Sequence, residues 1–126
     1  MNKLFQIVFL FALAGCGAAE SATQSEPGLF VSEDLAPTLE SKYEEVKNCT
    51  GLSGESFTSL RIELSPYPIK CDQYDGRCMA YFSTPNTIQI SFTGSFAHEV
   101  IHYLLYLQAG DSDRDHKSDL FAKCGT

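Results

Sequence analysis

Basic residues are scarce in this chain, and that scarcity limits the partners it can bind. Nine Lys and Arg stand against sixteen Asp and Glu, so the 126 residues carry a formal net charge of −7 at pH 7. A nucleic-acid-binding protein needs a basic surface that neutralises phosphates, and we therefore expect no nucleic-acid partner. The acidic residues are spread over the chain, as on an ordinary solvated surface, and they indicate no particular substrate.

A hydrophobic run long enough to cross a bilayer is also missing. The apolar run at residues 4–13 is shorter than the roughly 20 residues that a spanning helix needs. It follows Lys3 and precedes Ala14 and Gly15; a positive residue, a short apolar run and small residues are typical of an export signal. We therefore expect residues 1–15 to be a signal peptide that is removed from the mature chain.

The end of this signal, Leu13-Ala14-Gly15-Cys16, resembles the lipobox of bacterial lipoproteins, where cleavage falls before the cysteine and the cysteine receives lipid. The resemblance implies that Cys16 is the lipid anchor of the mature chain, since several acyl chains hold a protein firmly on a membrane. It implies a place in the bacterial cell envelope, and Gly17 after the cysteine favours the outer membrane, on its periplasmic or surface side. An ordinary signal peptide with a small-residue cleavage site is the alternative.

Repeats and a second domain are absent as well. Residues 16–33 are mostly small and polar and contain Pro27 and Gly28, so after the lipidated cysteine we expect a flexible tether. Residues 34–126 would then form one small domain. A core of that size is marginal unless disulfides or a metal ion add to it.

The cysteine count provides such links. With Cys16 lipidated, four of the five cysteines remain: Cys49, Cys71, Cys78 and Cys124. An even number in an exported chain predicts two disulfides, for which three pairings exist. We favour Cys71–Cys78, which closes a short loop around an Asp-Gly turn, and Cys49–Cys124, which closes a long loop.

Hydrophobic periodicity predicts the order of the secondary structure elements. The expected helices cover residues 37–47, the segment between Ser95 and Gly110, and residues 118–123, and the expected strands cover residues 57–64, 79–82 and 87–92. Ser95 is the expected N-cap of the middle helix, and Gly110 is expected just beyond its end. A helix, about three strands and two more helices predict an α+β fold.

All three histidines lie near the middle helix. Two of them frame His98-Glu99-Val100-Ile101-His102, an HExxH pattern whose histidines, four residues apart, share one face of a helix. Zinc accepts imidazole nitrogens in a tetrahedral shell and keeps one position open for water in a catalytic site. The glutamate is then the general base toward that zinc-bound water. We predict one zinc ion, bound by His98 and His102, with Glu99 catalytic.

A third ligand is expected from the segment that follows the helix. His116 is the first candidate, and Asp113 and Asp115 are alternative ligands or partners that orient a ligating imidazole. A solvated acidic loop is the simplest alternative for the aspartates. A calcium loop of the EF-hand type is disfavoured, because the sixth and twelfth positions counted from Asp111 are His116 and Ala122 instead of Gly and Glu.

The motif also carries a resemblance to a known family. His98-Glu99-Val100-Ile101-His102 resembles the active-site helix of the zincin metallopeptidases. With the following segment 110–116 and Cys124, it resembles small bacterial lipoproteins classed as metallopeptidases. The resemblance implies a small zincin-like domain and a peptidase that uses Glu99 and a zinc ion held by His98, His102 and a downstream residue.

The chain departs from the best-known zincin patterns. Leu105 and Gln108 stand where metzincins need Gly and His, and no glutamate follows Glu99 to serve as a gluzincin ligand. In zincins the strand before the motif helix forms an edge that pairs with extended substrate, and residues 87–92 resemble that strand or are an ordinary sheet strand. Tyr81, Tyr103 and Tyr106 are candidates to stabilise an oxyanion, and none is preferred.

The expected function is that of a monomeric zinc metallopeptidase of the cell envelope, acting on a peptide or protein substrate. One alternative is a lipoprotein that binds zinc without catalysis, through His98, His102, His116 and Asp113. Another is an interaction module in which the motif is incidental. Glu99 separates the first two, because a closed structural site gains nothing from a free carboxylate beside the metal.

Overall fold

The computed structural model describes residues 29–30, 34–72 and 75–126. The expected signal peptide (1–15), Cys16 and nearly all of the tether lie outside this part of the chain. Leu29–Phe30 was expected in the tether, but it forms strand β1, which pairs with the sheet in the register Leu29 to Ile62. The folded part therefore extends further toward the N-terminus than predicted. None of the helices in the described ranges is long and apolar enough to span a membrane.

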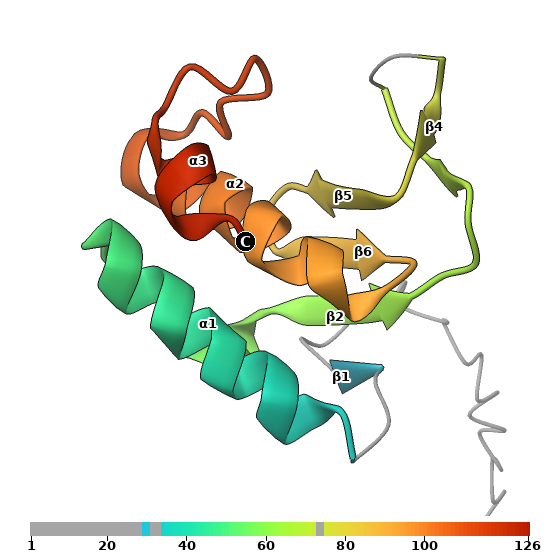
Figure 1. Ribbon diagram of the computed structural model, residues 1–126, viewed down its shortest axis with the longest axis horizontal. Coiled ribbons are helices and arrows are strands. Elements are labelled where there is room, and N and C mark those ends of the chain that lie inside the picture. The colour runs from blue at the N-terminus through green and yellow to red at the C-terminus, as the bar shows by residue number, and fades with distance from the viewer. Residues whose placement is uncertain (1–28, 31–33, 73–74) are drawn as a thin grey trace, which may run out of the picture.

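The described elements confirm the α+β class. The helices are α1 (Ala36–Thr50), α2 (Phe96–Ala109) and α3 (Leu120–Cys124), with 3-10 turns η1 (Phe57–Ser59) and η2 (Thr93–Ser95). The strands that follow β1 are β2 (Arg61–Leu64), β3 (Ile69–Lys70), β4 (Arg77–Cys78), β5 (Ala80–Ser83) and β6 (Thr87–Ile90). Figure 1 shows α2 lying beside the larger sheet, with α1 and α3 next to it.

The larger sheet has the order β1-β2-β6-β5. Strands β1, β2 and β6 are parallel, whereas β5 runs antiparallel to β6 and forms one edge. Strand β6 lies between β2 and β5, so both of its edges are already paired. The interpretation of residues 87–92 as a substrate-pairing edge is therefore wrong, and the edge next to the motif helix is β5. Strands β3 and β4 form a separate antiparallel pair.

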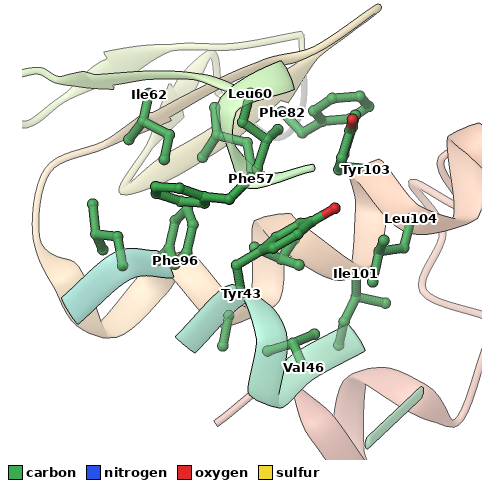
Figure 2. Packing of buried hydrophobic residues seen from close by; sticks show 14 of the residues in the cluster. Tyr43, Val46, Phe57, Leu60, Ile62, Phe82, Phe96, Ile101, Tyr103 and Leu104 are labelled. Atoms are coloured by element: carbon green, nitrogen blue, oxygen red, sulfur yellow. The ribbon is translucent and has the colours of Figure 1, made fainter. Parts of the chain in front are cut away.

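One face of this sheet builds the core. Ile62, Ile88 and Ile90 are fully buried and belong to the same core cluster as Phe82. Figure 2 shows Ile62 and Phe82 on the side of the sheet that faces the helices. Helix α2 contributes the largest share of buried residues: Phe96, Ala97, Val100, Ile101, Tyr103 and Leu104. The helix is hydrophobic nearly all round and was expected to be buried along its length, but Gln108 and Ala109 at its end are exposed. The burial of its N-terminal part holds the motif residues in a fixed orientation beside the sheet.

Two of the predicted strands are shorter in the structure than expected. Residues 57–64 were expected to be one strand, but Phe57 begins the 3-10 turn η1 and only Arg61–Leu64 is β2. Phe57 and Leu60 are both buried, and their spacing of three residues fits a 3-10 turn better than a strand. Phe92 was expected to be buried at the end of a strand, but β6 ends at Ile90 and Phe92 is 46% exposed.

The ends of α2 are partly as predicted. Gly110 terminates the helix in the left-handed region, with φ 71°, and its N–H donates to the Tyr106 carbonyl at 2.8 Å. Ser95 occupies the N-cap position but makes no capping hydrogen bond, because its hydroxyl donates to the Phe92 carbonyl at 2.8 Å. The Ser95 hydroxyl, which was expected to cap the helix, thus forms its hydrogen bond within the preceding 3-10 turn.

Both predicted disulfides are present. Cys49–Cys124 links the last turn of α1 to α3, across a sequence separation of 75. Cys71–Cys78 joins the two sides of the β3–β4 hairpin across a separation of 7. Gly76, in the turn of that hairpin, has φ 78°, a conformation that glycine adopts without strain.

Candidate metal centre

Three imidazoles converge beside the N-terminal half of α2. The Nε2 atom of His116 lies 2.9 Å from Nε2 of His98 and 3.1 Å from Nε2 of His102. The potential ligand atoms of the three residues all lie within 4.8 Å of one another. Nitrogen ligands about 2.0–2.1 Å from a tetrahedral zinc ion stand roughly 3.3 Å apart. The three histidines are therefore close enough to bind one metal ion.

His116 reaches this position from a loop shaped by Asp113. The two carboxylate oxygens of Asp113 accept hydrogen bonds from the backbone N–H groups of Lys117 and Ser118, at 3.0 and 2.7 Å. Its carbonyl accepts the N–H of His116 at 2.9 Å. Asp113 and His116 both have φ 53°, which is uncommon for residues with a side chain. Asp113 thus stabilises the turn that presents the third imidazole.

Neither aspartate proposed as a ligand joins the cluster. In the described part of the chain, the group of potential ligands consists of the three histidines. The carboxylate of Asp113 is engaged by the loop backbone, and Asp115 is exposed and lies 3.4 Å from the Lys117 ammonium.

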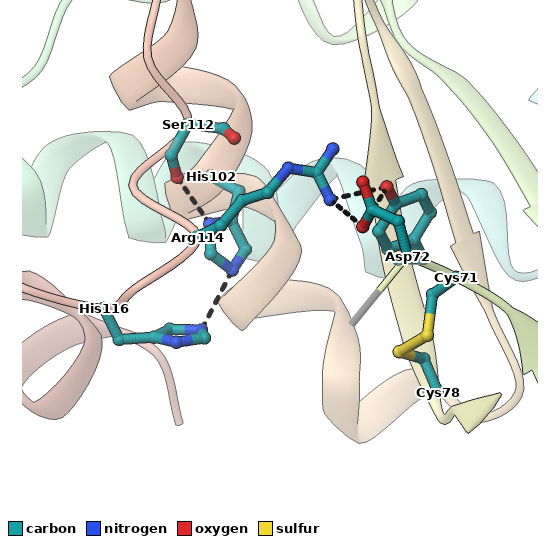
Figure 3. A network of polar contacts seen from close by, with 8 residues as sticks. Cys71, Asp72, Cys78, His102, Ser112, Arg114 and His116 are labelled. Atoms are coloured by element: carbon teal, nitrogen blue, oxygen red, sulfur yellow. Dashed lines mark hydrogen bonds and ion pairs between the residues drawn. A yellow bond between two sulfur atoms is a disulfide. The ribbon is translucent and has the colours of Figure 1, made fainter. Parts of the chain in front are cut away.

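The partner that orients His102 is a backbone carbonyl. Its Nδ1 donates to the Ser112 carbonyl at 2.6 Å (Figure 3), which leaves Nε2 with a lone pair for a metal. Burial, the first cause, lowers the pKa of His102 from 6.5 to about 4, and burial together with the charge of His116 also lowers the pKa of His98. Both imidazoles are therefore neutral near pH 7, as metal ligands must be.

Phe121 of α3 forms the wall behind the imidazoles. Its ring centroid lies 5.0 Å from that of His98, 4.6 Å from that of His102 and 4.7 Å from that of His116. The sequence predicted only that Phe121 packs in a short helix. The sequence spacing between Phe121 and the motif does not reveal this contact. Only the folded chain, with the Cys49–Cys124 disulfide, brings α3 to the site.

Glu99 is buried beside His98. Its side chain is 6% exposed, and burial raises its pKa from 4.5 to about 7, against smaller opposing effects of a hydrogen bond from the Phe82 backbone and of the Arg114 charge. A carboxyl group that titrates near neutral pH can accept and release a proton under physiological conditions.

The imidazoles and Glu99 open into one cavity of about 520 Å³. Strands β4 and β5 line one side, and the loop with Ser112 and His116 lines the other. Met79 and Phe92, at the rim, are 55% and 46% exposed. Apolar side chains around a few convergent polar groups are typical of a ligand site.

No protein-family model, characterised protein or solved structure matches this chain. Any functional conclusion therefore rests on the motif and on the geometry of the site.

The three tyrosines considered for oxyanion stabilisation lie in different surroundings. Tyr81 lines the cavity. Tyr103 is fully buried, and its hydroxyl has no hydrogen-bond partner among the described residues. Tyr106 packs on Phe82, with ring centroids 5.8 Å apart. Of the three, Tyr81 is the one that borders the cavity with the imidazoles.

Proposed function

We propose that this protein is a zinc-dependent metallopeptidase of the zincin type. The observation that carries the proposal is the convergence of three imidazole Nε2 atoms next to a buried glutamate in one open cavity. Two of the imidazoles and the glutamate come from one HExxH helix, which supports a peptidase more than an unrelated metal site.

Three imidazole ligands favour zinc, and the ligand number favours an open site. Zinc is commonly bound by histidine, and three protein ligands with one open position are typical of a catalytic centre. A closed site with Asp113 as fourth ligand has less support, because both of its carboxylate oxygens accept backbone N–H groups. The three imidazoles and Glu99 line the cavity in which a substrate would lie.

Glu99 has the position and the acidity that a general base requires. Bound zinc would polarise the scissile carbonyl and increase the acidity of water. Glu99 would accept the proton of the attacking water and then donate it to the leaving amine. In the metal-free chain burial raises its pKa to about 7, so the carboxyl group is already poised to exchange a proton near neutral pH.

The sheet edge beside the cavity supports a peptide substrate. Strand β5 pairs only with β6 in the described sheet and forms the edge beside α2. An extended peptide can bind to such an edge by backbone hydrogen bonds. The exposed side chains of Met79 and Phe92 would contact apolar side chains of that peptide. The lipobox-like sequence at Cys16 supports a lipid-anchored enzyme in the cell envelope.

The first experiment measures metal content and cleavage by the full chain, exported with its own leader and extracted from membranes in mild detergent. We expect about one zinc ion per chain, lost in a His98→Ala/His102→Ala variant. We expect cleavage of a peptide mixture by wild type and none by Glu99→Gln, which keeps the ligands. A folded wild type without zinc would refute the proposal, and zinc without any cleavage would favour the non-catalytic alternative.

Substitutions at the rim test the peptide-binding side. Met79→Gln should raise KM for peptides with apolar side chains and leave kcat nearly unchanged. Leu64→Gln is the matched control, because Leu64 is similarly exposed (47%) and does not line the cavity. Equal KM values in the two variants would mean that Met79 does not contact the substrate.

A further inference from the structure

A polar bridge connects the histidine loop with the disulfide-closed hairpin. Arg114 precedes His116 by two residues, and its Nη1 donates to the Asp72 carboxylate at 2.6 Å and to the Tyr81 hydroxyl at 2.5 Å. The Tyr81 hydroxyl in turn donates to Asp72 at 2.7 Å. Figure 3 shows Arg114 extending from the loop toward Asp72, next to the Cys71–Cys78 disulfide.

We propose that Arg114 is a positioning residue for the third imidazole, and that Asp72 and Tyr81 are its anchor. The inference rests on the metal site of the proposed function and adds the β3–β4 hairpin to it. In this arrangement the hairpin does not touch the metal, but fixes the loop that supplies one ligand.

The third imidazole needs such support more than the other two. His98 and His102 belong to α2, whose packing against the core fixes their backbone. His116 lies in a loop without regular structure, where Asp113 and His116 itself adopt φ 53°. The hydrogen bonds of Asp113 to Lys117 and Ser118 hold this turn together internally. The Arg114 bridge connects it with β5 and the hairpin on the opposite side of the cavity.

The geometry of the bridge depends on a guanidinium group. The Arg114 guanidinium also lies over the Tyr81 ring, 4.8 Å from its centroid. A planar guanidinium can stack on a ring and donate several hydrogen bonds at once, which a lysine ammonium cannot reproduce. Asp72 is held near by the adjacent Cys71, whose disulfide to Cys78 closes a sequence separation of only 7. The bridge therefore ends on a covalently constrained segment.

The direction in which zinc affinity changes when Arg114 is replaced separates positioning from simple electrostatics. A guanidinium near a divalent cation repels it, so removing the charge of Arg114 should strengthen metal binding if charge alone matters. If Arg114 positions His116, its removal should weaken metal binding. Partners that orient ligands typically change metal affinity by 10- to 100-fold, and we expect about tenfold here, because the bridge is partly solvent-exposed.

The test measures zinc affinity of the full chain in detergent, by competition with a chromophoric chelator. The visible spectrum of the cobalt-substituted protein reports the ligand geometry. Arg114→Ala, Arg114→Lys and Asp72→Asn should each bind zinc about tenfold more weakly and change the cobalt spectrum. Asp115→Asn is the matched control, since it removes the same charge as Asp72→Asn from a residue whose ion pair is with Lys117 in its own loop. It should behave as wild type.

The outcomes separate this inference from the proposed function. Unchanged or tighter zinc binding in Arg114→Ala, in a wild type whose zinc depends on His116, overturns the positioning role and leaves the metal site standing. A wild type that binds no zinc overturns both. Thermal melting of the metal-free variants identifies any that fail to fold. If Arg114→Ala is unfolded, Arg114→Lys, which keeps the charge, tests the positioning role in its place. Equal losses of zinc affinity in Asp72→Asn and Asp115→Asn also overturn the positioning role, since the loss of one negative charge then explains the weaker binding.

Discussion

Glu99 shows how strongly the fold acts on one side chain. It is 6% exposed, and burial is the main reason why its pKa rises from 4.5 to about 7. The unfolded chain releases this proton near pH 4.5, whereas the folded metal-free chain keeps it until about pH 7. The folded state therefore loses stability, relative to the unfolded state, as the pH rises between these values.

We expect the metal-free wild type to lose about 3 kcal/mol of unfolding free energy, relative to Glu99→Gln, between pH 4.5 and pH 7.5. His102, whose pKa falls from 6.5 to about 4, has the opposite effect: the unfolded chain binds more protons, so stability rises with pH over that interval. Both proteins contain His102, so their difference isolates Glu99. Urea unfolding at several pH values in the presence of a chelator measures it. Parallel pH curves would mean that Glu99 is solvated in the folded protein.

The sequence could predict the site residues whose function requires a fixed spacing along the chain. His98, Glu99 and His102 follow a helical repeat, His116 was the remaining histidine, and the structure brings the three imidazoles together. The Ser112 carbonyl that orients His102 could not be found, because every residue has a carbonyl. Asp113 was considered as a possible ligand or orienting partner, and the structure shows its carboxylate accepting the backbone N–H groups of Lys117 and Ser118. The sequence does not distinguish these roles, since an acidic residue suits both.

At the scale of elements, α3 is short but closes the site. Its Phe121 packs against all three imidazoles, and Cys124 ties it to α1. Apolar walls exclude water from metal ligands and limit how far their rings turn. The position of α3 thus affects the metal centre even though it supplies no ligand.

Phe121→Ala should weaken zinc binding about tenfold, because the imidazoles then have space to rotate. Leu120→Ala is the control: Leu120 is on the same helix and also packs against the core, but the ring that contacts the three imidazoles belongs to Phe121. We expect Leu120→Ala to lower the melting temperature and leave zinc affinity nearly unchanged. Isothermal titration with zinc compares the two. Equal losses of affinity would show that α3 acts only through overall stability.

The elements were predicted better in kind than in position. Helix α2 was expected within about a residue of its limits, because apolar periodicity and Gly110 mark it. For residues 87–92 an edge strand and an ordinary sheet strand both stayed open, because sequence does not reveal which strand lies outermost in a sheet. Strand β1 was not predicted, because Leu29–Phe30 is only two residues long and shows no alternation of apolar and polar residues.

At the scale of the whole molecule, two disulfides constrain different parts of a small domain. Cys49–Cys124 closes a separation of 75 residues and joins α1 to α3. Cys71–Cys78 closes a separation of 7 within one hairpin. In the chain-entropy model the longer loop restricts the unfolded chain more, so the two bonds should differ in their effects on stability and on the metal centre.

Cys49→Ser/Cys124→Ser should lose roughly 4 kcal/mol of unfolding free energy, and Cys71→Ser/Cys78→Ser roughly 2.5 kcal/mol. The first loss approaches the whole stability of a domain of this size, so this variant should be largely unfolded at 37 °C without metal. Saturating zinc should recover part of it, by about 2.7 kcal/mol at a hundredfold excess over Kd, because only the folded chain brings the imidazoles together. Urea unfolding of the wild type and both variants, with and without zinc, measures these three free energies. If the hairpin variant is the less stable one, the loop-closure account is wrong for this fold, and local packing around Cys71–Cys78 contributes more than chain entropy.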